Sequence, residues 1–179
     1  MIIAEKQKQL LVYDCFQLTV SKRTSIMRLS INEEKNLMDA LRVAEYIVSY
    51  CYKTESPITN LQLQKMLYFL WIDYYKKYNK DLFGDTFYAW NLGPVVFSVY
   101  KEYCVYGGMP IRPVFEPDEF FGDKNEEEEF NKMIDQYKMI SGLELVKKSH
   151  DPNGAWIVFY DKNNKWSEIP FEAIRERGR

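Results

Sequence analysis

The chain has 179 residues, of which 46% are hydrophobic and 28% charged, as in one globular domain with a short appendage. Its formal net charge of −2 lacks the basic excess that proteins binding the phosphate backbone of nucleic acids normally carry. Aromatic side chains make up 16% of the chain, which fits either an aromatic-rich core or a protein contact surface.

The first 37 residues have no pattern that assigns them to a helix or a strand. They contain a small basic cluster of Lys22, Arg23 and Arg28. We therefore expect an N-terminal extension over residues 1–37, whose structure the sequence does not define, followed by one domain over residues 38–179.

Two amphipathic helices are predicted at the start of this domain. Asp39 suits the beginning of the first, whose apolar side chains recur every three or four residues until Ser56 and Pro57 stop it. Thr59 and Gln62 have the spacing of a capping box for the second helix. The stripe that the second helix buries comprises Leu63, Leu67, Leu70, Trp71, Tyr74 and Tyr78.

A short strand and a third helix are expected next. Residues 86–91 are aromatic and bounded by turn residues, which is typical of a strand. Proline suits the first position of a helix, so Pro94 after Gly93 predicts a third helix, which Gly107 and Gly108 would close.

The remaining elements are shorter. The acidic run 126–129 fits the start of a fourth helix, where the macrodipole favours negative charge, and residues 143–146 indicate a fifth. Residues 149–156 indicate an ordered turn, 157–166 a hairpin, and Pro170 the start of a last helix. The predicted class is mainly α, a compact helical domain with a few short β-strands.

Patterns that indicate catalysis or metal binding are scarce. With His150 as the single histidine and no Cys-x-x-Cys pair, the sequence predicts no metal site, and glycine-rich phosphate or dinucleotide loops, which would indicate a cofactor, are absent. Ser149 and Asp151 flank His150, but adjacent turn residues cannot place nucleophile, base and orienting group in line. We predict no enzyme; the alternative is a small hydrolase using His150 with Ser149 or a nearby carboxylate.

The sequence also bears on the location of the protein. No apolar run approaches the ~18 residues of a membrane span. The N-terminus soon meets Glu5, Lys6 and Lys8 instead of an apolar signal segment. We expect a cytoplasmic protein with no membrane partner.

Three stretches occur in a characteristic order: residues 41–48, ITNLQLQKMLYF at 58–69 and FYAWNLGPVV at 87–96. Together they resemble the Panacea domain, the family of SocA-like antitoxins often described as phage-associated proteins. A weaker likeness covers residues 145–150 with Trp156. There Ser149 stands where the family has Thr, and Ala155 stands where it has Pro.

The resemblance implies a mainly helical antitoxin, encoded beside a toxin, that neutralises this toxin by direct contact. One branch of the family is an adaptor that delivers its toxin to the ClpXP protease, so a protease of this type is a second implied partner. A homo-oligomer is left open. A DNA-binding autoregulator would depend on the three basic residues of the extension, too few for strong operator binding without dimerisation.

Five side chains are candidates for toxin binding: Gln64, Lys65, Tyr68, Trp90 and Trp156. The first three lie off the buried stripe of the second helix, so they either face a partner or bond back to residues 90–94. The two tryptophans are either core anchors or the centre of a contact patch. Six further residues are expected to hold the fold: Leu63, Leu67, Trp71, Gly93, Pro94 and His150.

Overall fold

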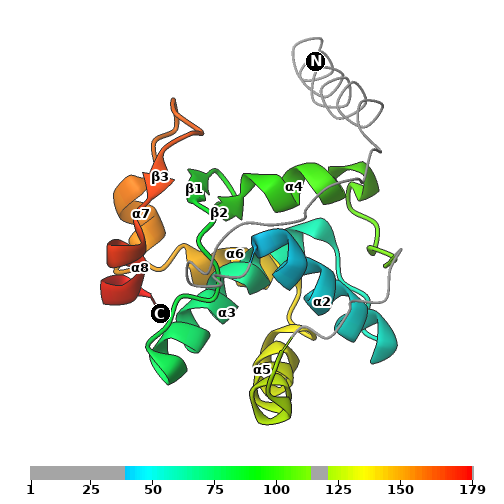
Figure 1. The fold of residues 1–179 in the computed structure, drawn as a ribbon. Coiled ribbons are helices and arrows are strands. Elements are labelled where there is room, and N and C mark those ends of the chain that lie inside the picture. The colour runs from blue at the N-terminus through cyan, green and yellow to red at the C-terminus, as the bar shows by residue number, and fades with distance from the viewer. Residues whose placement is uncertain (1–38, 114–120, 179) are drawn as a thin grey trace, which may run out of the picture. The chain divides into compact units, whose positions relative to one another are not determined.

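The computed structural model of the chain describes residues 39–113 and 121–178. The expected N-terminal extension lies outside these residues, and the division of the chain at residue 38 stays a prediction. The described part is mainly helical with one small sheet, which confirms the predicted class (Figure 1).

The first two helices begin where their capping residues predict. Helix α2 (Ala40–Lys53) starts after Asp39, whose carboxylate accepts the N–H of Leu41 at 2.8 Å. Helix α3 (Asn60–Tyr78) starts with the capping box of Thr59 and Gln62. Both predictions are confirmed. A capping side chain bonds to backbone groups within one turn of its own helix, so the local sequence is enough to predict it.

A three-stranded antiparallel sheet follows, with strand order β2-β1-β3. Strand β1 (Phe87–Trp90) is the predicted one, and it pairs with β2 (Gly93–Val96) in a tight hairpin. The helix predicted from Pro94 is therefore wrong at its start: α4 (Phe97–Tyr103) begins after the strand and continues into a 3-10 turn, η1 (Cys104–Tyr106). Pairing with β1 satisfies backbone groups that a helix would otherwise have bonded internally.

Four short elements and one longer helix complete the domain. Helix α5 (Lys124–Tyr137) and helix α6 (Gly142–Ser149) match the fourth and fifth predicted helices. The predicted hairpin over residues 157–166 is wrong, because helix α7 (Ala155–Phe159) forms there. Strand β3 (Glu168–Ile169) instead pairs with β1, and α8 (Phe171–Arg177) follows Pro170 as predicted.

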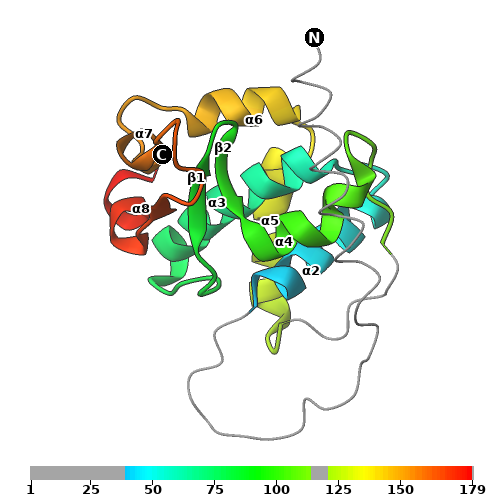
Figure 2. The ribbon, with the colours of Figure 1, turned by 90° about the horizontal axis from the view of Figure 1, so that it is seen from above.

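Helix α3 is the central element of the domain. It packs against α2, α4, α5, α6, α8 and strand β2, so it is covered nearly all round, including on the flank predicted to be off its buried stripe. Figure 2 shows the β1–β2 hairpin lying across this helix, with α6 beside the tip of the hairpin. Leu63, Leu67 and Trp71 are completely buried in the core.

No helix in the described part combines the length and the apolar character needed to cross a membrane.

Candidate functional site

The outer edge of strand β2 is closed by two side chains of α3. Lys65 Nζ donates to the carbonyl oxygen of Pro94 at 2.6 Å, and Gln64 Oε1 accepts the N–H of Val96 at 2.9 Å. Pro94 has no N–H to leave unpaired at this edge, which is where a sheet tolerates proline. An edge strand normally presents a row of unpaired backbone groups to solvent. Here the carbonyl of Pro94 and the N–H of Val96 are instead bonded to side chains of α3.

Gly93 lies at the point where the hairpin comes closest to α3 and α6. Its φ of +95° is a conformation that glycine adopts without strain. A Cβ atom here would lie 2.4 Å from Ser149 Oγ and 3.1 Å from Lys65 Nζ. Both the backbone conformation and the lack of space therefore require glycine at this position.

Tyr68 connects the same face of α3 to helix α7. Its ring is 2% exposed and lies edge-on to Phe87 of β1, with 5.5 Å between the ring centroids. Its hydroxyl forms a hydrogen bond with the backbone of Ala155, the first residue of α7, whose N-cap Gly154 has no side chain to offer. Burial raises the pKa of Tyr68 to about 12, so the phenol stays protonated and neutral.

His150 and Trp156 hold the other side of the hairpin. The two rings stack with 3.8 Å between their centroids and an angle of 5° between their planes. Trp156 Nε1 donates to the carbonyl oxygen of Trp90 at 2.9 Å, and Tyr160 donates to Asn91 Oδ1 at 2.9 Å. The end of α6 and helix α7 thereby clamp the turn of the hairpin. We call Gln64, Lys65, Tyr68, Gly93, Pro94, Ser149, His150 and Trp156 the anchor cluster.

The electrostatics of the anchor cluster are unusual because a lysine lies at its centre. Lys65 is completely buried, and this burial lowers its pKa well below the ordinary value of a lysine. Burial, and secondly the charge of Lys65, also lowers the pKa of His150. Nε2 of His150 is buried and has no hydrogen-bond partner in the described part of the chain.

The geometry of Ser149 and His150 does not match that of a nucleophile and its base. Ser149 Oγ donates to the carbonyl oxygen of Val146, one turn back in its own helix, at 2.8 Å. The ring of His150 is stacked on Trp156. Among the described residues no hydrogen bond joins the serine to the imidazole, which activation of the hydroxyl would need.

Trp90 differs from the other candidates because it is only half-buried. Along β1 the side chains alternate, so that Phe87 and Ala89 enter the core while Tyr88 and Trp90 point to the opposite face of the sheet. There Trp90 meets Tyr100 of α4 at 4.8 Å and Trp166 at 6.3 Å between ring centroids. Phe97 of α4 lies 5.0 Å from Trp166, which is 45% exposed. We call Tyr88, Trp90, Phe97, Tyr100 and Trp166 the aromatic face.

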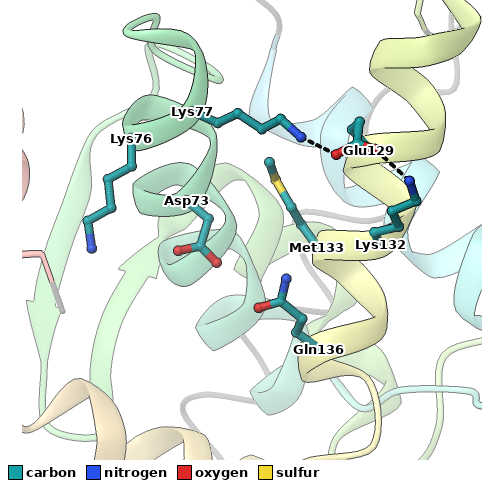
Figure 3. A pocket seen from close by; sticks show the side chains of 7 residues that line it. All are labelled: Asp73, Lys76, Lys77, Glu129, Lys132, Met133 and Gln136. Atoms are coloured by element: carbon teal, nitrogen blue, oxygen red, sulfur yellow. Dashed lines mark hydrogen bonds and ion pairs between the residues drawn. The ribbon is translucent and has the colours of Figure 1, made fainter.

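A surface pocket of about 370 Å³ lies elsewhere, between α3 and α5 (Figure 3). Glu129 forms ion pairs with both Lys77 and Lys132, and these lysines lower the pKa of Glu129 to about 2. Asp73 accepts a hydrogen bond from Tyr137 at 2.6 Å. None of the candidate residues lines this pocket, and its acidic side chains already have partners.

The structure thus gathers most of the candidate residues in one place but gives them different surroundings. Gln64, Lys65, Tyr68 and Trp156 are buried beneath or beside the hairpin, whereas Trp90 reaches the surface. The sequence analysis missed the aromatic partners of Trp90. The alternation along β1 indicates Tyr88, but the contacts with α4 and with Trp166 depend on the tertiary structure.

The anchor cluster lies within the part of the chain that matches a known protein family. The sequence profile of the family described as "Antitoxin SocA-like, Panacea domain" matches residues 63–157, more than half of the chain. Over 138 residues the chain is 27% identical to the Antitoxin SocA of Caulobacter vibrioides (strain NA1000 / CB15N), an alignment covering 72% of this chain and 73% of that protein. No solved structure matches the chain.

Proposed function

This chain belongs to the Panacea-domain family of SocA-like antitoxins, and on that premise we propose that it neutralises a cognate toxin by binding it directly. The toxin would be the polypeptide encoded beside it. Neutralisation would occur by formation of a complex and not by an enzymatic reaction.

The observation that supports this proposal is the aromatic face around Trp90. Tryptophan and tyrosine are enriched at protein contact surfaces because they combine a large contact area with little loss of rotamer entropy. Here they gather on the outer face of a hairpin whose position is secured from within. A rigid element that presents aromatic side chains needs little ordering when it binds.

The five candidate residues take two different parts in this proposal. Trp90 contacts the toxin, since it is the one among them that is only half-buried. Gln64, Lys65, Tyr68 and Trp156 act indirectly, because their buried side chains hold the hairpin against α3 and α7.

A titration tests whether neutralisation is stoichiometric. Purified chain is added in increasing amounts to the neighbouring toxin, and the remaining toxic activity is measured at each ratio. We expect full protection near an equimolar ratio, because each bound toxin occupies one antitoxin. Complete protection at a small fraction of that ratio would contradict binding and indicate turnover.

The part assigned to Trp90 is tested with a matched pair of variants. Trp90→Leu keeps an apolar side chain beneath Phe97 and Tyr100 but removes the indole, whereas Tyr52→Ala removes an exposed aromatic ring from α2. We expect Trp90→Leu to weaken toxin binding by roughly tenfold or more and Tyr52→Ala to leave it unchanged. Equal affinities of both variants and the wild type would rule out a contact at Trp90.

We also propose, from the branch of the family that acts as an adaptor, that the complex delivers its toxin to a ClpXP-type protease. The half-life of purified toxin is measured with this protease and ATP, in the presence and absence of the chain. Delivery predicts faster degradation when the chain is present. An unchanged or longer half-life would leave neutralisation to binding alone.

A further inference from the structure

Beside the aromatic face lies a lysine that forms no ion pair with any described residue. Lys165 Nζ lies 5.2 Å from the ring centroid of Trp166 and 6.0 Å from that of Trp90. Nε1 of Trp90 is buried and, among the described residues, has no hydrogen-bond partner.

In the described part of the chain, the carboxylates nearby in sequence do not form ion pairs with Lys162 or Lys165. Asp161 Oδ1 accepts the backbone N–H of Asn163 and so stabilises its own turn. Glu168 of β3 is exposed beside Tyr88, but in the described part of the chain neither it nor any other carboxylate forms an ion pair with Lys162 or Lys165. Both lysines therefore remain available to an anion from outside.

We propose that the aromatic face binds an acidic segment of the toxin, which places a carboxylate beside Lys165 and an apolar side chain against Trp90 and Trp166. This proposal rests on the proposed function and names the chemistry of the partner at the same surface. The Trp166 ring lies beside the ammonium of Lys165, so one partner segment can contact both the charge and the exposed apolar surface.

Charge complementarity supports an acidic partner at this place. The chain as a whole carries a net charge of −2, so an acidic segment gains no general attraction to it. The 161–166 loop carries two lysines and one aspartate, a net charge of +1, next to an exposed apolar ring. Such an arrangement selects the orientation of a partner and accelerates its approach.

The packing of the rings favours a protein over a single-stranded nucleic acid. Nucleic-acid platforms offer open ring faces on which successive bases stack. Here Trp166 meets Tyr88, Trp90 and Phe97 at interplanar angles of 89°, 85° and 76°, so the rings use their faces and edges on one another.

Calorimetric titration of the full chain with the neighbouring toxin tests the proposal, at about 50 mM and about 300 mM NaCl. The variants are Lys165→Gln and Lys165→Glu, with Lys80→Glu as a matched control at an exposed lysine of another loop. Circular dichroism verifies that each variant is folded, as expected for changes at exposed side chains.

We expect the affinity of the wild type to fall as salt rises. Lys165→Gln should weaken binding and Lys165→Glu should weaken it further, by roughly tenfold or more, whereas Lys80→Glu should bind as the wild type does. The salt dependence should also be smaller in Lys165→Gln, because one ionic contact is gone.

Three results would overturn the proposal. If the wild type neutralises and binds the toxin but Lys165→Glu binds equally well, the acidic segment is wrong while the antitoxin function stands. If the wild type does not bind the toxin, the proposed function fails, and this inference fails with it. If an oligothymidylate of about 20 nucleotides binds the wild type as tightly as the toxin does and Trp166→Ala abolishes both, the face recognises nucleic acid.

Discussion

At the scale of single residues, Gly93 disfavours any side chain by two independent criteria, its backbone conformation and the space around it. Gly93→Ala would strain a backbone with φ +95° and would place a Cβ atom against Ser149 and Lys65. We expect it to lower the free energy of unfolding by more than about 1 kcal/mol, measured by urea denaturation.

Gly107→Ala is the matched control for this substitution. Gly107 also has a positive φ, of +54°, but no heavy atom lies within 4 Å of a Cβ atom placed there. Its cost should be that of the backbone alone and therefore smaller. Equal losses in the two variants would show that the close approach of the hairpin to α3 and α6 adds nothing.

His150 makes the stability of the protein depend on pH. Burial and the charge of Lys65 lower its pKa in the folded chain, so below about pH 6.5 the unfolded chain binds the proton more readily. The stability that depends on the neutral imidazole is therefore complete above about pH 6.5 and decreases as the pH falls towards the pKa of the folded state. The measurement is the urea midpoint at about pH 7.5 and about pH 5.5.

His150→Phe isolates this contribution. It keeps an aromatic ring stacked on Trp156 but removes the titrating group. The loss of stability between the two pH values should be smaller in this variant than in the wild type. The same loss in both proteins would assign the pH dependence to other groups, such as the buried Lys65, whose pKa is also lowered by burial, or carboxylates elsewhere.

At the scale of elements, the edge of β2 depends on a glutamine in a helix. Gln64→Met keeps the length of the side chain but leaves the buried N–H of Val96 without an acceptor, and it also removes the hydrogen bond from Gln64 Nε2 to Asn60. We expect a loss of about 1–3 kcal/mol in the free energy of unfolding, the cost of an unsatisfied buried donor. Amide hydrogen exchange at Val96 should become faster.

A second glutamine provides the control for this variant. Gln136 lies exposed on α5, and Gln136→Met should change the unfolding free energy by less than about 0.5 kcal/mol. Unchanged protection of Val96 in Gln64→Met would mean that the strand edge does not need the helix side chain.

At the scale of the whole molecule, the hydrophobic core of the described domain is built from side chains between Ala40 and Ile174. We predict that a chain of residues 38–179 unfolds cooperatively, within a few degrees of the full chain, because α3 and the elements around it lie within this range. Thermal unfolding by circular dichroism measures both chains. A broad transition without cooperativity would show that the first 37 residues belong to the folding unit.

Local signals in the sequence determined the limits of most helices. Asp39, Thr59 and Gln62 satisfy backbone groups within one turn of their own helices, so no distant residue is needed to interpret them. The periodic stripe along α3 depends equally on local spacing, and Leu67 is buried as it predicts. Membership in the antitoxin family could also be inferred from ordered motifs alone.

Only the tertiary structure decided which of two local options each ambiguous segment adopts. Pro94 suits a helix start as well as a strand edge, and the pairing of β2 with β1 selects the strand. Lys65 is polar and off the apolar stripe, yet it is buried because the edge of β2 provides a carbonyl acceptor 29 residues further along the chain. The segment after Gly154 forms a helix whose first residues are held by Tyr68 and Trp90. These outcomes depend on partners distant in sequence, and a hydrogen bond to such a partner exists only once the fold has brought the two segments together.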